Sequence, residues 1–202
     1  CHLARMGMTD VVVLEQGYLC FGASGRNGGG VRQQWSNRES ILLAKQSVRQ
    51  WRQLARETGH NIGFRQGGYL FLARDAESAT ALEHNVKLQN SRGVSTRLIS
   101  PADAERLVPG LDGTGVEVCS YNPNDGVLFP WPALWGMASV ATSLGVEINT
   151  FTRVTGLDVR GREIVKVLTD RGAIATSRVV NAAGAWSWQI ARMAGVELPN
   201  KP

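Results

Sequence analysis

The residues with the clearest chemical meaning begin at an acid that ends a hydrophobic run. The stretch VVVLEQG, residues 11–17, places Glu15 directly after four apolar residues. In a dinucleotide-binding unit, a carboxylate at the end of the second parallel strand accepts hydrogen bonds from the hydroxyls of an adenosine ribose. A solvated acid at a strand end has the same local sequence, so the stretch alone leaves both interpretations open. Such a unit also has a first strand with a glycine-rich turn, whereas only ten residues precede Val11 here.

A glycine-rich segment follows this acid. In GASGRNGGG, residues 22–30, five of the nine residues are Gly. Such a segment lets backbone amides approach a phosphate or a flat ring closely. Ser24 adds a hydroxyl and Arg26 a fixed positive charge, which suits a pyrophosphate. A glycine-rich segment by itself is more often only a loop. Its place directly after Glu15 favours a cofactor loop.

A third motif lies near the end of the chain. VVNAAGAWS, residues 179–187, reads as a buried strand that leads into small residues and the start of a helix. Small residues at such a junction permit the close passage of a cofactor. Tight packing of a strand against a helix requires the same small residues, so this alternative stays open.

Both helices and strands are predicted around these motifs, so we expect a mixed α/β chain to position them. Helices are predicted where apolar residues recur at helical spacing and are flanked by Gly, Asp or Pro. These helices lie at 37–58, 75–93, 130–144 and 185–193, with a short helix after Ser100 and the end of an earlier helix at 1–7. Strands are predicted at 11–14 (buried), 62–73 (two strands around Gly67-Gly68), 116–121, 147–151, 154–159, 164–169, 173–176 and 178–183, with a loop at 16–35.

Composition narrows the class of partner. The net charge is +5, from 22 basic and 17 acidic residues, but the basic residues form no block, which argues against nucleic acid. No apolar run approaches the roughly 20 residues of a transmembrane helix. The three Cys and three His residues have no CxxC or metal-ligand spacing, so neither a disulfide framework nor a metal site is expected. Free thiols favour a reducing compartment, and we expect a cytoplasmic protein.

Taken together, the motifs resemble those of a known family. VVVLEQG, GASGRNGGGVR and VVNAAGAWS are similar to the FAD-dependent amine and amino-acid oxidoreductases of the D-amino-acid oxidase type, in particular the branch of sarcosine oxidase beta subunit and glycine oxidase. DGVLFPWPALWGMASVATSLGVEI, residues 125–148, resembles the family's segment of Asp-Gly, Pro, helix and strand. The resemblance covers essentially the whole chain.

The resemblance implies how the chain is organised. A partial Rossmann-like FAD-binding domain would comprise residues 1–35 and 146–202. Residues 36–145 would form part of a substrate domain built on an antiparallel sheet. The family's first strand with its GxGxxG turn and its C-terminal FAD segment are not in the sequence, so we expect an internal piece of a larger enzyme.

The resemblance also assigns roles to matching positions. Glu15 would bind the ribose, and the backbone of Val154 would meet the adenine. The other cofactor positions would follow the pyrophosphate, ribitol and flavin, and they are Ser24, Arg26, Asn27, Gly28, Gly29, Ala182, Ala183, Gly184 and Trp186. Arg32 would pair with the carboxylate of the substrate. The sequence is also compatible with an ordinary surface arginine at this position. Arg65 and Tyr69 are weaker candidates for substrate contact.

The implied chemistry is oxidation of a C–N bond in a small amino acid or N-methyl amino acid, such as glycine or sarcosine. FAD would remove a hydride and leave an imine that water hydrolyses. No His follows His84, where a His-linked branch would attach its flavin, so we expect FAD to be bound non-covalently.

Two other functions are compatible with parts of the sequence. The chain could be a non-catalytic binding or assembly subunit of a multi-subunit flavin enzyme. An NAD-dependent dehydrogenase would explain Glu15 but not GASGRNGGG. Without the first strand, neighbouring strands have an open edge. We therefore expect the 202 residues alone to bind FAD poorly, to be inactive, and to associate as a homodimer or with the subunits of a hetero-oligomer.

Overall fold

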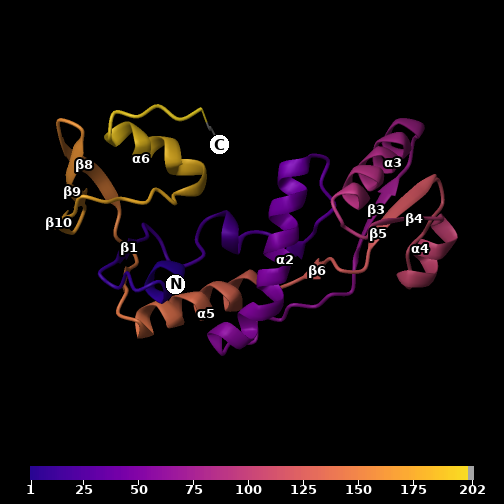
Figure 1. Ribbon diagram of the computed structural model, residues 1–202, viewed down its shortest axis with the longest axis horizontal. Coiled ribbons are helices and arrows are strands. Elements are labelled where there is room, and N and C mark those ends of the chain that lie inside the picture. The colour runs from indigo at the N-terminus through magenta and orange to yellow at the C-terminus, as the bar shows by residue number, and fades with distance from the viewer. Residues whose placement is uncertain (200–202) are drawn as a thin grey trace. The chain divides into compact units, whose positions relative to one another are not determined.

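The structure is a computed structural model that describes residues 1–199, and it divides the chain into two compact units. The first unit comprises residues 1–27 and the chain from residue 134 onward, and the second comprises residues 28–133. Helices and small sheets occur in both units (Figure 1). The mixed α/β class is therefore confirmed. The assignment of cofactor binding to 1–35 and 146–202, and of a substrate domain to 36–145, stays a prediction.

The first unit contains a two-stranded parallel sheet and a three-stranded antiparallel sheet. Its elements are α1 (His2–Arg5), β1 (Val12–Leu14), the 3₁₀ turn η1 (Ala23–Gly25), most of α5 (Pro130–Ser143), β7 (Glu147–Asn149), β8 (Val154–Arg160), β9 (Glu163–Thr169), β10 (Gly172–Ala175), the 3₁₀ turn η2 (Gly184–Trp186) and α6 (Ser187–Met193).

The strands of the parallel pair β1–β7 are far apart in the chain, because residues 28–133 of the second unit and α5 lie between them. Val13 lies opposite Ile148 in the register of this pair. Ala4, Ala141 and Val146 form the buried cluster beside the strands, with Val11 and Ile148 packed against it.

The prediction that this first strand is buried was wrong for two of its residues. Val12 and Val13 are 37% and 40% exposed. Their side chains point to opposite faces of the sheet. Within residues 1–199, β1 also has the single neighbour β7, so its other edge is unpaired.

The second unit is organised by the antiparallel sheet β3-β5-β4 and the short pair β2–β6. Its elements are β2 (Gly30–Val31), α2 (Arg38–Thr58), β3 (Tyr69–Ala73), α3 (Ala76–Ser91), β4 (Arg97–Ile99), α4 (Pro101–Leu107), β5 (Val118–Asn122) and β6 (Gly126–Val127). Ala104, Val116 and Cys119 are the centre of its sheet-side core.

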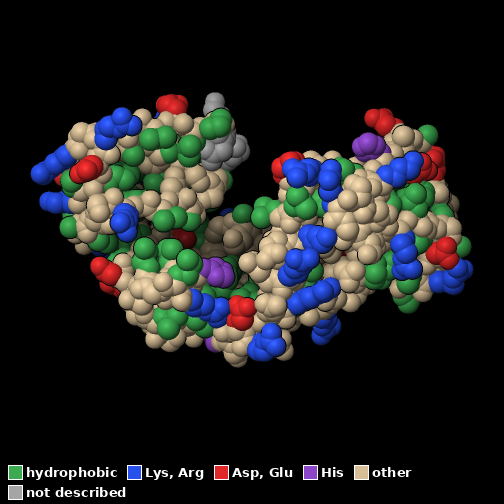
Figure 2. Space-filling model, viewed as in Figure 1, with side chains coloured by type: hydrophobic (Ala, Val, Ile, Leu, Met, Phe, Trp, Pro, Cys, Tyr) green, Lys and Arg blue, Asp and Glu red, His purple; other side chains and the backbone are tan. Residues whose placement is uncertain are grey.

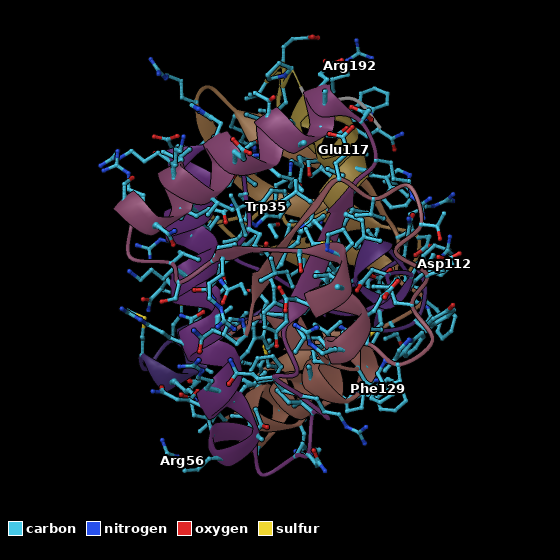
Figure 3. All side chains as sticks on the ribbon, turned by 90° about the vertical axis from the view of Figure 1, so that its right-hand side faces the viewer. Trp35, Arg56, Asp112, Glu117, Phe129 and Arg192 are labelled. Carbon is cyan, nitrogen blue, oxygen red and sulfur yellow. The ribbon has the colours of Figure 1, made fainter. Side chains whose placement is uncertain are left out.

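Local sequence explains where the helices of this unit begin. The side chains of Asn37, Asp75 and Ser100 accept hydrogen bonds from backbone N–H groups in the first turns of α2, α3 and α4. These side chains satisfy donors that a helix start leaves unpaired. Arg56 lies in the last turn of α2 (Figure 3), which Gly59 ends with a left-handed φ of 71°.

Two predicted strands are absent. Residues 62–68 form no strand, and Arg65 makes only an isolated bridge with Val127. Residues 178–183 are also not a strand, and most of them are exposed. A strand requires a neighbour for its N–H and C=O groups. No strand in the described part of the chain lies beside residues 178–183.

Candidate functional site

Glu15 lies at the carboxyl end of β1 and is partly buried. Its Oε1 accepts a hydrogen bond from the N–H of Gly17 at 2.7 Å. Its backbone continues the pairing with the neighbouring segment, since its N–H donates to the carbonyl of Asn149 and its carbonyl accepts from Thr152. Burial, and to a lesser degree the charge of Glu15, raises the pKa of the nearby Cys20 thiol. Glu15 is thus a rigidly placed carboxylate at a strand end.

A hollow of about 580 Å³ lies directly beyond this acid, in the first unit. Its walls combine aromatic rings, backbone, and one basic and one acidic residue. The lining residues are Gln16, Gly17, Tyr18, Phe21, Phe151, Arg153 and Asp170. The N–H of Arg153 donates to Asp170 Oδ1 at 2.9 Å. Val154, the predicted adenine position, follows Arg153 and begins β8. The volume and the mixed aromatic and polar lining are compatible with an aromatic ring system that has a polar edge.

The predicted pyrophosphate residues of the first unit form a compact turn after the hollow. The guanidinium carbon of Arg26 lies 4.6 Å from the centre of the Phe21 ring. The Asn27 amide donates to the backbone carbonyl of Ser24 at 2.7 Å. Gly25 is required by space, because a Cβ there would lie 2.1 Å from the carbonyl oxygen of Cys20.

The structure brings part of the C-terminal motif to this turn. A Cβ added to Gly22 would lie 3.9 Å from the Trp186 ring, so this ring lies near the glycine-rich segment. Asn181 Nδ2 donates to the carbonyl of Ser187 at 2.8 Å and closes the turn that contains Ala182, Ala183 and Gly184. Glu15 accepts a hydrogen bond from Gly17 in the wall of the hollow, and Trp186 lies near Gly22, whereas Ala182 is exposed.

The predicted residues Gly28, Gly29 and Arg32 belong to the second unit. Gly29 has a φ of 73°, and a Cβ there would lie 1.9 Å from the carbonyl oxygen of Leu128. The N–H of Leu128 donates to the Gly29 carbonyl at 2.9 Å. Gly28 has nothing within 4 Å of a Cβ. The positive φ and the close Leu128 carbonyl therefore require glycine at position 29, whereas no neighbouring atom requires glycine at position 28.

Arg32 is partly buried between aromatic rings. Its guanidinium carbon lies 4.5 Å from the centre of the Trp35 ring and 5.2 Å from that of Phe71. Trp35 (Figure 3) also donates its indole N–H to the backbone carbonyl of Arg32 at 3.2 Å. Stacking on aromatic faces holds a guanidinium in place and leaves its N–H edge for a carboxylate.

Sequence reasoning missed a buried polar cluster beside Arg32. Asp125 is fully buried and accepts hydrogen bonds from Gln33 and Gln34, which are each 7% exposed. The signal was present, because Asp125-Gly126 opens one of the segments that resemble the family. Nothing in that segment indicated that Gln33 and Gln34 are its partners.

The fold and the site define the class of protein. An acid at the end of a parallel strand, a hollow beyond it and a glycine-rich turn are the parts of a site for an adenine-containing cofactor. Residues 1–202 match the family described as "DAO: FAD dependent oxidoreductase", and the chain belongs to this family. The resemblance stated from the motifs is confirmed, and FAD is the cofactor of the family.

Two curated relatives align over nearly the whole chain. Sarcosine dehydrogenase, mitochondrial, of Homo sapiens is 32% identical over 204 residues, which cover 98% of this chain and 22% of that protein. Sarcosine oxidase subunit beta of an Arthrobacter species is 29% identical over 198 residues, covering 96% and 49%. The chain thus spans less than half the length of either relative.

Solved structures share the fold. L-proline dehydrogenase from P. horikoshii has a TM-score of 0.90 at 37% identity, covering 96% of this chain and 51% of that one. L-amino acid deaminase from Proteus myxofaciens, in complex with anthranilate, has a TM-score of 0.87 at 27% identity, covering 98% and 45%.

The residues of the first unit fit the adenosine end of FAD. Gly17 lines the hollow and donates its N–H to Glu15, and a Cβ at Gly17 would lie 2.7 Å from the Phe21 ring. Among residues 1–199, no group of three or more His, Cys, Asp or Glu residues could hold a metal ion.

The conformation of Gly29 gives a direct test of the glycine-rich segment. We expect Gly29→Ala to lower the free energy of unfolding by at least about 1–2 kcal/mol, since a side chain is strained at positive φ and this one would collide with Leu128. Gly28→Ala, the matched control, should change it by less than about 0.5 kcal/mol. Denaturant unfolding of both variants measures the difference. Equal effects would mean that the approach of Gly29 to Leu128 does not occur.

Proposed function

We propose that this chain is part of an enzyme that oxidises the C–N bond of a small amino acid or N-methyl amino acid with FAD. The observation that carries the proposal is Glu15, held at the end of a parallel strand and beside a hollow of about 580 Å³ in a member of an FAD-dependent family.

The first unit would hold the cofactor. Glu15 would accept hydrogen bonds from the ribose hydroxyls, and the backbone of Val154 would face the adenine. Arg26 and Ser24 would face the pyrophosphate with Asn27, and the turn of Ala182, Ala183, Gly184 and Trp186 would lie along the pyrophosphate and ribitol. In the second unit, Gly28 and Gly29 would allow a close approach to the backbone. We expect the FAD to be non-covalent.

Arg32 would bind and orient the substrate through its carboxylate. Its guanidinium lies over Trp35 and Phe71, so little side-chain entropy remains to be lost when a carboxylate pairs with it. FAD, when bound, would supply the oxidation by accepting a hydride from the carbon of the C–N bond, with loss of a proton from the nitrogen, and water would hydrolyse the resulting imine.

The names of the relatives support the substrate class. Sarcosine is an N-methyl amino acid and proline is a cyclic one, and proteins named for each align with this chain. All of these substrates combine a carboxylate with an amine on the neighbouring carbon. The proposal is therefore for this class, with the particular amino acid left open.

An assembly role is the second candidate function. One relative is a beta subunit, which by its name works within a multi-subunit protein. Large apolar side chains are exposed in the second unit, among them Phe129 at 66% (Figure 3) and Val127 at 45%. We propose association with subunits of this kind, or with a second copy, in addition to catalysis. The match to the flavin family disfavours an NAD-dependent dehydrogenase.

Two further proposals concern nucleic-acid binding and the location of the protein in the cell. Lys and Arg side chains are spread over both units on the visible face (Figure 2), in line with a protein that does not bind nucleic acid. None of the helices among residues 1–199 is long and apolar enough to cross a membrane. The three cysteines are free thiols, on which the proposal of a cytoplasmic location rests.

The 202 residues alone should bind FAD weakly and oxidise no amine. Strand β1 has one neighbour among the described residues, so its other edge is unpaired, and Val12 and Val13, just before Glu15, are exposed. Visible absorption of the purified chain before and after adding FAD measures this. A stoichiometric complex with flavin bands that survive gel filtration would contradict it.

The role of Glu15 can be tested in protein expressed from the complete open reading frame. Glu15→Gln should raise the Kd for FAD by about tenfold, since a hydrogen bond to a charged group contributes about 1.5–3 kcal/mol and the amide retains one acceptor. Glu117→Gln, which changes an acid in the second unit, is the control. Isothermal titration of the apoprotein with FAD gives both values, and an unchanged Kd for Glu15→Gln would remove this residue from the cofactor site.

The role of Arg32 predicts a change in substrate affinity. Arg32→Met should raise KM for the amino acid by about 10- to 100-fold, since it removes a charge-assisted pair of hydrogen bonds. Arg97→Met is a matched control, because Arg97 also lies over an aromatic ring, that of Tyr121 at 5.7 Å. Steady-state kinetics with sarcosine, glycine and proline measure both. If both variants changed KM equally, Arg32 would have no specific role in binding.

A further inference from the structure

The second unit contains a carboxylate that the proposed chemistry does not use. Asp125 is fully buried, in the segment just before β6. Its Oδ1 accepts hydrogen bonds from the backbone N–H of Gln33 at 2.9 Å and from the Gln33 side chain at 3.0 Å. Its Oδ2 accepts a longer one from Gln34 at 3.3 Å. Burial raises the pKa of Asp125, and these hydrogen bonds and the charge of Arg32 oppose the rise.

The glutamines that surround this carboxylate are themselves held by the sheet. Gln34 Nε2 donates to the carbonyl of Tyr69 at 2.8 Å, and Gln34 Oε1 accepts from Ser120 at 2.8 Å. Tyr69 begins β3 and Ser120 lies in the middle of β5. A buried carboxylate without partners is strongly unfavourable. The cluster therefore joins the segment after β2 to the central sheet of the unit in one arrangement.

The cluster acts directly on the peptide bond that follows Arg32. The N–H of that peptide, from Gln33, donates to Asp125, and its carbonyl, from Arg32, accepts from the Trp35 indole at 3.2 Å. Both polar groups of one peptide are thus held from different elements. The same Trp35 ring lies under the Arg32 guanidinium at 4.5 Å, and the carbonyl of Trp35 accepts from Gln89 at 3.1 Å. The direction in which Arg32 leaves the backbone is set by these bonds.

We propose that Asp125 is a positioning residue for the substrate carboxylate, because it fixes the peptide from which Arg32 projects. The inference rests on the proposed function, in which Arg32 pairs with the carboxylate of an amino acid. Asp125 touches neither substrate nor cofactor. It acts by keeping the guanidinium over Trp35, so that the arginine is ordered before the substrate arrives.

A purely structural role makes a different prediction. If Asp125 only stabilised the unit, its replacement would lower stability and affect carboxylate binding equally whether or not Arg32 was present. If it acts through Arg32, its effect on binding must disappear once Arg32 is replaced. A double-mutant cycle separates these two cases.

The experiment uses FAD-loaded protein from the complete open reading frame and three probes, acetate, benzoate and anthranilate. Each probe is titrated while the change in flavin absorption is recorded. Asp125→Asn, which preserves shape, should raise the Kd of the probes by about 5- to 10-fold in the parent protein. In an Arg32→Met background the same substitution should change it by less than about twofold.

Controls separate this effect from a loss of stability. Thr58→Val removes a buried hydroxyl that donates to the carbonyl of Leu54 at 2.8 Å, elsewhere in the second unit. It should lower the melting temperature and leave the Kd unchanged. If Asp125→Asn does not fold, Gln33→Leu takes its place in the cycle, because it removes one of the bonds to Oδ1. Gln33→Leu should raise the Kd of the probes by about threefold, and only when Arg32 is present.

The outcomes distinguish the two proposals. If Arg32→Met leaves the Kd unchanged, or if none of the probes binds, Arg32 is not the carboxylate site and both proposals fail. If Arg32→Met weakens binding but Asp125→Asn and Gln33→Leu do not, only the positioning role is overturned. Equal effects of Asp125→Asn in both backgrounds also overturn it. In that case Asp125 only stabilises the unit.

Discussion

The burial of one carboxylate, Asp125, organises the second unit around the segment that carries Arg32. A charge without water requires donors, and here they come from the backbone and side chain of Gln33 and from the side chain of Gln34. These donors can meet the carboxylate only if the segment after β2 lies against β3 and β5. The aromatic setting of Arg32 between Trp35 and Phe71 follows from that placement.

The first unit depends on a different constraint, the parallel pairing of β1 with β7. The ends of two parallel strands lie at the same edge, and the chain leaves that edge through Glu15 on one side and through Asn149 on the other. The hollow beyond them is made from the segments that follow each strand, with Tyr18 and Phe21 from one and Phe151 and Arg153 from the other. Loops at the carboxyl edge of a parallel sheet are the usual place for a nucleotide.

Close contacts with other residues explain some glycines of the glycine-rich segment, residues 22–30, but not all of them. Gly25 and Gly29 have no room for a side chain, because the carbonyls of Cys20 and Leu128 lie within 2.1 and 1.9 Å of where a Cβ would be. Gly28 meets no such neighbour. The segment therefore contains glycines of two kinds. The fold explains the first kind, whereas no neighbouring atom of the structure requires glycine at position 28.

The sequence by itself determined the helices with clear caps, the hairpin strands β8 to β10, the α/β class and the family. Those features depend on local periodicity, on capping side chains such as Asp75, and on motifs that are contiguous in the chain. It could not determine the exposure of Val12 and Val13, the loss of the strand at 178–183, or the partners of Asp125. A strand exists only where another segment pairs with it, and a buried charge selects partners that are 91 and 92 residues away in the chain. Only the tertiary structure decided these, because each depends on which distant segments meet.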